Sequence, residues 1–203
     1  FRKAVCAGQL EVEDYTNYQM SLRFLAGALG LPTMATRSGL GTDLVSKDGF
    51  PPDARGKGKV PKKKLMVADD PWGDNGQQLV FLPALNPDVT LLHAQYVGED
   101  GTVRIKGLTF SDLEQARAAD HVIVTCEEIV PESFIRQDPD QNSLPCFLVD
   151  AVVKTPHGAH PTACAYFYDY DPQHLRLYAR MAGDDKLFRQ YLDEWVYEPQ
   201  DFE

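Results

Sequence analysis

The chain has few cysteines, few basic residues and no long apolar run. Its four cysteines lie far apart without CxxC spacing, so we expect reduced, mostly buried thiols, with disulfides as the alternative that an even number leaves open. A net charge of −10 argues against nonspecific nucleic-acid binding, which needs a basic surface. No apolar stretch approaches the length of a membrane span, and no signal-peptide pattern is found. We therefore expect a cytoplasmic protein without a membrane or nucleic-acid partner.

Familiar catalytic motifs are missing as well. The sequence has no G-x-S-x-G elbow, no P-loop and no G-x-G-x-x-G turn. His157 and His160 flank Gly-Ala in a loop bounded by prolines, but their spacing off a helix is poor for a metal, and no cysteine or carboxylate completes a site there. We predict no metal and no tightly bound cofactor.

The stretch from Leu79 to Val130 has the alternation of an α/β layer. Apolar runs at 79–82, 89–94 and 121–126 predict strands, residues 102–107 are rich in β-formers, and Ser111-x-x-Glu114 is typical of a helix cap. Residues 143–154 form another strand region. The pattern predicts an α/β fold with a mixed, mostly parallel sheet flanked by helices. Its polar residues follow buried strands, where α/β sheets bind ligands.

Three other segments are typical of helices. They are residues 18–30, ended by Gly30 and Pro32, residues 172–181, started by Asp171-Pro172 and stopped by Gly183, and the amphipathic residues 184–196. Residues 32–78 are a long, Gly/Pro-rich polar connection, a feature that is usually functional or mobile. We expect residues 1–203 to form one domain.

Short phrases along the chain match, in order, those of a known family. They are Asn86-Pro-Asp-Val89, Leu92-His-Ala-Gln95, Asp100-Gly-Thr-Val-Arg-Ile105, Ala118-Ala119, Ile123-Val-Thr-Cys-Glu-Glu-Ile129, Val149-Asp-Ala-Val-Val153, Gly158-Ala-His-Pro161 and Tyr168-Asp-Tyr-Asp171. With them the chain resembles the A (α) subunits of glutaconate CoA-transferases, within the two-subunit family I CoA-transferases. The resemblance runs from about Phe1 to Trp195, which is nearly the whole chain.

The resemblance also implies a missing portion. Chains of this family carry a further N-terminal part with a Gly-rich entry loop and the first strands of the sheet. The present sequence opens at Phe1-Arg-Lys-Ala-Val, which is typical of the inside of a helix. We therefore expect a fragment that lacks the N-terminal part of the fold.

The function implied by the resemblance is that of the A subunit of a heteromeric CoA-transferase. Such an enzyme would move CoA between a short dicarboxylic acyl-CoA and an acceptor acid such as acetate, with CoA as a substrate. The nucleophilic Glu would belong to a partner B subunit and would form an anhydride and then a glutamyl-CoA thioester. Two alternatives remain open: a CoA-thioester or ring-opening C–C hydrolase on the same scaffold, and a non-catalytic scaffold subunit.

A Gly/Ser-rich loop at residues 36–43 is the candidate substrate contact. Small residues let a ligand approach the backbone, successive amides can cradle an anion, and an arginine can bind a carboxylate with both arms. Together with the resemblance, this predicts that Arg37, Ser38, Gly39 and Gly41 bind the acyl group, against the alternative of a plain flexible loop. His160 is predicted to line the mouth of the active site.

Three carboxylates are candidates for chemistry. Glu13, just before the first clear helix, is the catalytic candidate in the hydrolase branch of the family, with favourable charge at a helix N-terminus as the alternative. Glu127 and Glu128 follow an apolar strand and could act as paired acids. Because they match a phrase of the A subunits, we favour a structural or interface role for them.

Two further features have plain structural interpretations. His93 lies in or after an apolar strand and is interpreted as a hydrogen-bonded core histidine. The basic run Lys57–Lys64 is interpreted as a solvated surface loop, with contact to the phosphates of CoA as the alternative.

Overall fold

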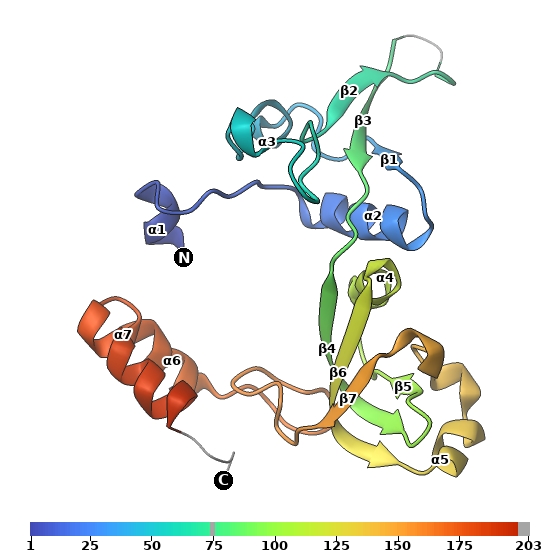
Figure 1. Ribbon diagram of the computed structural model, residues 1–203, viewed down its shortest axis with the longest axis vertical. Coiled ribbons are helices and arrows are strands. Elements are labelled where there is room, and N and C mark those ends of the chain that lie inside the picture. The colour runs from blue at the N-terminus through green and yellow to red at the C-terminus, as the bar shows by residue number, and fades with distance from the viewer. Residues whose placement is uncertain (74–75, 199–203) are drawn as a thin grey trace. The chain divides into compact units, whose positions relative to one another are not determined.

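The computed structural model describes residues 1–73 and 76–198. They divide into two compact units, one made of Phe1–Thr90 and Thr109–Val122, the other of Leu91–Leu108 and the chain from Ile123 onward (Figure 1). Strands β4 (Val89–Gly98) and β6 (His121–Val130) begin in the first unit and continue in the second.

The first unit contains a three-stranded sheet with helices. Its elements are α1 (Arg2–Cys6), α2 (Asn17–Ala28), β1 (Thr33–Thr36), α3 (Asp43–Ser46), the 3-10 turn η1 (Pro52–Ala54), β2 (Met66–Asp69), β3 (Gln78–Pro83) and α4 (Asp112–Ala118). The strand order is β1-β3-β2, and β3 is antiparallel to both neighbours. Only the central strand has fully buried side chains, Val80 and Leu82, so the apolar core of this sheet follows β3.

Helix α2 begins at a capping box. The Thr16 side chain accepts from the Gln19 amide at 3.0 Å, and the Gln19 side chain accepts from the Thr16 amide at 3.0 Å. The helix buries Gln19, Arg23 and Ala26, which recur at helical spacing, and it packs against α4. A polar residue and a cation thus occupy the inner face of this helix.

The second unit contains a four-stranded sheet with strand order β5-β4-β6-β7. Its remaining elements are β5 (Val103–Arg104), α5 (Glu132–Gln137), the 3-10 turns η2 (Pro139–Gln141) and η3 (Cys146–Leu148), β7 (Ala151–Lys154), α6 (Pro172–Met181), α7 (Asp185–Leu192) and the π-helical turn η4 (Asp193–Tyr197). Strand β5 is antiparallel to β4, and β7 is parallel to β6. Val97, Val124 and Cys126 are fully buried, which places the core along the two central strands.

The last two long helices form a hairpin in which α6 packs against α7 (Figure 1). Each starts at an aspartate whose side chain accepts from two backbone amides: Asp171 from Gln173 and His174, and Asp184 from Lys186 and Leu187. Losing such a cap typically costs about 1 kcal/mol. Local sequence signals therefore suffice to start both helices.

The predicted α/β class, with mixed sheet and flanking helices, is confirmed, and so are the helices at 18–30 and 172–181. The first sheet is antiparallel throughout, which the sequence did not indicate. Ser111 does precede α4, but its side chain makes no capping bond to the helix backbone. Residues 102–107 give only the two-residue strand β5.

The long connection at 32–78 contains short elements, namely β1, α3, η1 and β2. Residues 74–75 of this connection lie outside the described residues. Strands β1 and β2 have few buried side chains, so they lack the apolar alternation by which a strand is recognised in a sequence. No helix of the described residues is long and apolar enough to cross a membrane.

Candidate functional site

The Gly/Ser-rich loop connects β1 to α3 and is tied to the start of α2. Gln19 Nε2 donates to the Ser38 carbonyl at 2.8 Å, and the hydroxyls of Ser38 and Thr16 lie 3.2 Å apart. Gly39 has φ +87°, and a Cβ there would lie 2.6 Å from Gln19 Nε2. Ser38 and Gly39 therefore position the loop against the helix.

Other members of the loop face open space. The Arg37 side chain is 65% exposed, donates to Gln77 Oε1 at 2.5 Å and lies 3.9 Å from Asp70 Oδ2. Gly41 has φ +76°, and a Cβ added there would meet no heavy atom within 4 Å. The amides of Ser38, Leu40 and Thr42 are already donated within residues 36–42, so these three do not cradle an anion in this conformation.

Glu13 is the centre of a buried ion pair. Both carboxylate oxygens accept from the Arg55 guanidinium, at 3.0 Å for Oε2, and Oε2 also accepts from Tyr15 at 3.2 Å. Burial alone would raise the pKa of Glu13, but the hydrogen bonds and charge of Arg55, with the Gly49 amide and Tyr15, together lower it. A carboxylate held ionised in this way does not serve as a general acid at neutral pH. It stabilises a link between chain segments rather than the N-terminus of α2.

The basic run Lys57–Lys64 is only partly solvated. Lys57, Lys62 and Lys63 are exposed. Lys59 pairs with Asp88 at 2.8 Å and with Asp120 at 2.7 Å. Lys64 is buried and donates to the carbonyls of Leu44 at 2.6 Å and Lys47 at 2.7 Å. The interpretation as a plain solvated loop is therefore wrong for Lys64, because its ammonium replaces water with backbone carbonyls.

In the second unit, Glu127 and Glu128 point to different environments, as expected for neighbours in a strand. Strand β6 runs on to Val130, with Glu127 buried and Glu128 exposed. Only one of the two is thus available to any enclosed site, and a paired-acid arrangement does not form.

The Glu127 carboxylate is saturated with donors. Oε1 accepts from Tyr168 at 2.6 Å and lies 2.7 Å from His93 Nε2, and Oε2 accepts from the His157 amide at 2.8 Å. Burial would raise the pKa of Glu127, but the bonds from Tyr168, the His157 amide and His93 together lower it. His93 Nδ1 lies 2.9 Å from Thr125 Oγ1, so both ring nitrogens have partners. This geometry agrees with the structural interpretations of Glu127 and His93.

His160 lies beside the start of α6. Its Nε2 is 3.2 Å from Asp171 Oδ2, and its ring meets that of His174 edge-on at 5.0 Å between centroids. The expectation that no carboxylate accompanies this histidine is therefore wrong, since the fold brings Asp171 to it from eleven residues away. His160, Asp171 and His174 offer ligand atoms within 4.8 Å of one another, as do His93, Glu127 and Cys164.

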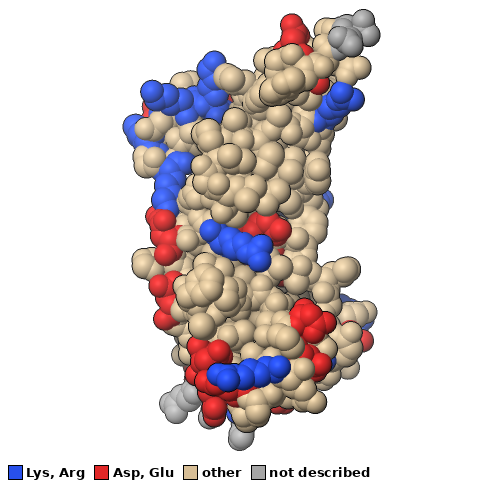
Figure 2. Space-filling model, turned by 90° about the vertical axis from the view of Figure 1, so that its right-hand side faces the viewer, with Lys and Arg blue, Asp and Glu red and all other residues tan. Residues whose placement is uncertain are grey.

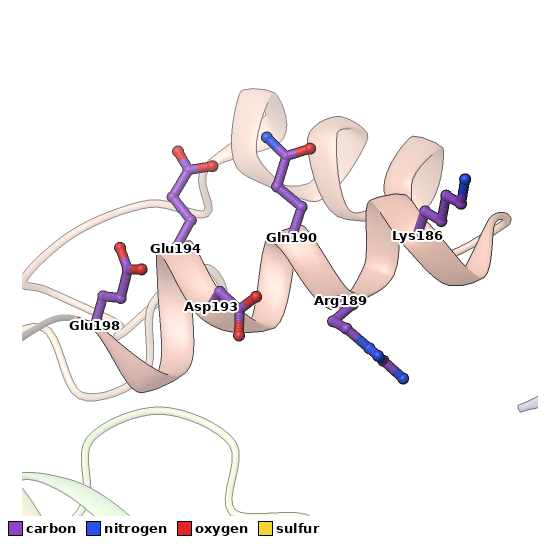
Figure 3. Close-up of a pocket in the computed structure, with 6 residues that line it drawn as sticks. All are labelled: Lys186, Arg189, Gln190, Asp193, Glu194 and Glu198. Atoms are coloured by element: carbon purple, nitrogen blue, oxygen red, sulfur yellow. The ribbon is translucent and has the colours of Figure 1, made fainter.

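A depression of about 530 Å³ lies along α7 and the π-helical turn that follows (Figure 3). Its lining is wholly polar, and Figure 3 shows Gln190 and Glu194 on one side of the helix and Arg189 on the other. The side chains diverge instead of converging on one point. On the face drawn in Figure 2, basic and acidic side chains are interspersed, as expected from the net charge of −10.

The comparison with known proteins decides the family. The profile of the coenzyme A transferase family matches residues 1–155. The chain is 40% identical to the A subunit of glutaconate CoA-transferase from Acidaminococcus fermentans, over 99% of this chain and 63% of that protein. The chain belongs to the coenzyme A transferase family.

Solved structures of family members agree with the fold described above. The crystal structure of the glutaconate CoA-transferase from A. fermentans matches with a TM-score of 0.93 over 99% of this chain and 63% of that one. The decarboxylase AibA/AibB matches with a TM-score of 0.76 at 28% identity, over 97% of this chain and 66% of that one. The chain is also 29% identical to the cholesterol ring-cleaving hydrolase IpdA subunit of Rhodococcus jostii, over 99% of this chain and 66% of that protein.

This member of the coenzyme A transferase family thus spans a little under two thirds of the length of its glutaconate relative. Its relatives carry the names of a transferase, a decarboxylase and a hydrolase, so the family alone does not fix the reaction. The predicted roles of Glu13, Arg37, Ser38, Gly39, Gly41 and His160 stay predictions.

Sequence reasoning missed the partners of the two buried carboxylates. Arg55 lies 42 positions from Glu13, and Tyr168 lies 41 positions from Glu127. It also missed Arg23, a cation on the buried face of α2. The position of Arg23 one turn after Gln19 on that face was the available signal, because charged residues seldom occupy buried helix positions.

Proposed function

We propose that this chain is the A subunit of a heteromeric CoA-transferase that moves CoA between a short dicarboxylic acyl-CoA and an acceptor acid such as acetate. The observation that carries the proposal is the likeness to the A subunit of glutaconate CoA-transferase, which extends in sequence and fold over nearly all of this chain. CoA is a substrate in this reaction, and no tightly bound cofactor takes part. The enzyme acts in the cytoplasm as a hetero-oligomer.

The nucleophilic Glu belongs to the partner B subunit. A carboxylate nucleophile attacks the thioester carbonyl, expels the CoA thiolate and forms an anhydride; the thiolate then attacks the enzyme's acyl carbon and releases the free acid. The nucleophile needs an unoccupied oxygen. In this chain the oxygens of Glu13 are bound by Arg55, and those of Glu127 are bound by Tyr168, His93 and the His157 amide. This supports a nucleophile supplied from outside the chain.

The chain contributes part of the acyl pocket through its Gly/Ser-rich loop. Arg37 is exposed on that loop, so its guanidinium can exchange Gln77 for the free carboxylate of a dicarboxylic acyl group. Ser38 and Gly39 hold the loop on α2, and Gly41 leaves its outer side open to a ligand. His160 lines the entrance.

A second candidate function is hydrolysis of a CoA thioester or of a ring carbon–carbon bond, favoured by the match to the IpdA subunit. Glu13 would be the catalytic carboxylate in that case. A third is a scaffold that only completes its partner. The three differ in products: a transferase conserves the thioester and needs an acceptor, a hydrolase consumes water, and a scaffold tolerates changes in the loop.

The test is an assay of the purified chain with and without its co-purifying partner. We expect acyl exchange that depends on acetate and on the partner, and no activity from the chain alone. Release of free CoA or of a ring-opened acid without an acceptor would identify the hydrolase instead. CoA transfer by this polypeptide in the absence of any partner would refute the proposed division of labour.

A further inference from the structure

A cavity of about 330 Å³ lies beside α2, wholly within the first unit. Its walls are mostly apolar and include Met20, Phe50, Val60 and Leu85. Arg23 and Lys59 add two cations to the lining. Apolar walls with a few convergent charged groups are the usual makeup of a small-molecule site.

Arg23 is only 6% exposed, yet its guanidinium is incompletely used. Nε donates to the Pro83 carbonyl at 3.1 Å, and Nη1 lies 3.7 Å from the Met20 sulfur, a weak acceptor. The Tyr15 ring stacks on the guanidinium with 4.2 Å from its carbon to the ring centroid. In the described part of the chain, no carboxylate pairs with Arg23.

The charges around Arg23 have partners of their own. The carboxylate of Glu13 is bound by Arg55. Lys59 pairs with Asp88 and Asp120, whose side chains are 81% and 60% exposed. Burial lowers the pKa of Arg23, which is the expected result where nearby anions do not offset the loss of water. A buried guanidinium is therefore left facing the cavity without a counter-ion.

We propose that this cavity binds the carboxylate of a short organic acid, with Arg23 as its ligand and the apolar walls around its carbon chain. A carboxylate matches the fork geometry of a guanidinium, and hydrogen bonds between two charges are strong when water is excluded. The inference rests on the proposed function, because a CoA-transferase handles two carboxylic acids. It assigns the binding of one of them to a buried arginine on α2, in addition to the exposed Arg37.

The test measures binding of glutarate to the complex of this chain with its partner by calorimetry. Pentane-1,5-diol, which has the same carbon chain without charge, serves as the comparison ligand. We expect glutarate alone to bind, and Arg23→Met to weaken it by roughly 10- to 150-fold, the range for hydrogen bonds to charged groups. The matched control is Arg117→Met, an exposed arginine on α4, which should bind glutarate like the parent.

A second variant keeps the test decisive if Arg23→Met does not fold. Val60→Trp fills the cavity from a half-buried loop position and leaves Arg23 in place, so it should also abolish glutarate binding. Equal binding of glutarate and the diol, or unchanged binding in the folded variants, would overturn the inference. If CoA transfer to acetate persists while these variants bind acids normally, the proposed function stands and the inference fails. If binding depends on Arg23 but no acid ever accepts CoA, the inference stands and the proposed function fails.

Discussion

Replacing Glu127 with Gln tests whether this carboxylate is structural or chemical. Glu127 is only 4% exposed, and its two oxygens take donors from three other segments of the second unit. Glutamine keeps the shape and one acceptor oxygen. It puts an amide NH₂ group in place of the second oxygen, where it meets a donor, either the His157 amide or the Tyr168 and His93 pair.

The expected loss of stability follows from these bonds. A hydrogen bond to a charged group contributes about 1.5–3 kcal/mol, and a buried donor left without an acceptor costs about 1–3 kcal/mol. Because the effects overlap, we expect Glu127→Gln to lower the free energy of unfolding by about 2–4 kcal/mol. That is a large fraction of the roughly 5–15 kcal/mol that stabilises a typical domain.

The assay is urea unfolding near neutral pH, with size-exclusion chromatography of the variant and its partner. Glu128→Gln is the matched control: it lies next in the same strand but is exposed, so the change should stay within about 0.5 kcal/mol. The pKa of Glu127 is lowered in the folded state. The difference between parent and variant should therefore be full above the ordinary carboxylate pKa and disappear as the pH falls through the lowered one.

Two results would refute this reasoning. If Glu127→Gln assembled and unfolded like the parent but lost several orders of magnitude in turnover, Glu127 would be a catalytic residue. If Glu128→Gln were equally destabilising, the different burial of the two neighbours would not be the cause.

Three other predictions concern the first unit. Glu13→Gln should lower the free energy of unfolding by about 3 kcal/mol because it leaves a buried guanidinium unpaired, and the parent should lose this contribution as the pH falls through the lowered pKa of Glu13, as urea titrations at several pH values would show. Gly39→Ala should cost more than the roughly 1–2 kcal/mol of a left-handed alanine, because its Cβ would meet Gln19, whereas Gly41→Ala should cost only that amount; thermal melts compare them. Arg37→Ala should weaken dicarboxylic acyl-CoA substrates by about 2–4 kcal/mol in kcat/KM and monocarboxylic ones far less; equal losses would exclude this role.

Local signals were enough to predict the helices and the long strands. Helix α6 begins at Asp171-Pro172 and α2 ends before Gly30, as their residue types require. Strands β4 and β6 are long apolar runs whose side chains are mostly buried. Strand β2 has no buried residue, so its pairing with β3 depends on the neighbouring strand rather than on its own pattern.

The site could not be predicted to the same extent, because its geometry depends on contacts between distant residues. The sequence marks Glu13 and Glu127 as candidates, but it contains nothing local that assigns Arg55 to the first or Tyr168 to the second. The distinction between Glu127 and Glu128 was accessible, since alternate strand residues face opposite ways. Which of the two is buried depends on the loop that carries the His157 amide.

Two charged side chains that are buried to nearly the same degree have different consequences for function. Glu127 is 4% exposed and Arg23 is 6% exposed. The fold fills both oxygens of the first with donors, so adding or removing a ligand changes nothing at that carboxylate. The fold gives the second one backbone acceptor, a sulfur and an aromatic face, and leaves it at a cavity with apolar walls. Burying a charge without a partner is unfavourable, and an organic acid that enters the cavity removes that cost. Completeness of the partner set, rather than burial itself, therefore separates the structural charge from the one that is available to bind substrate.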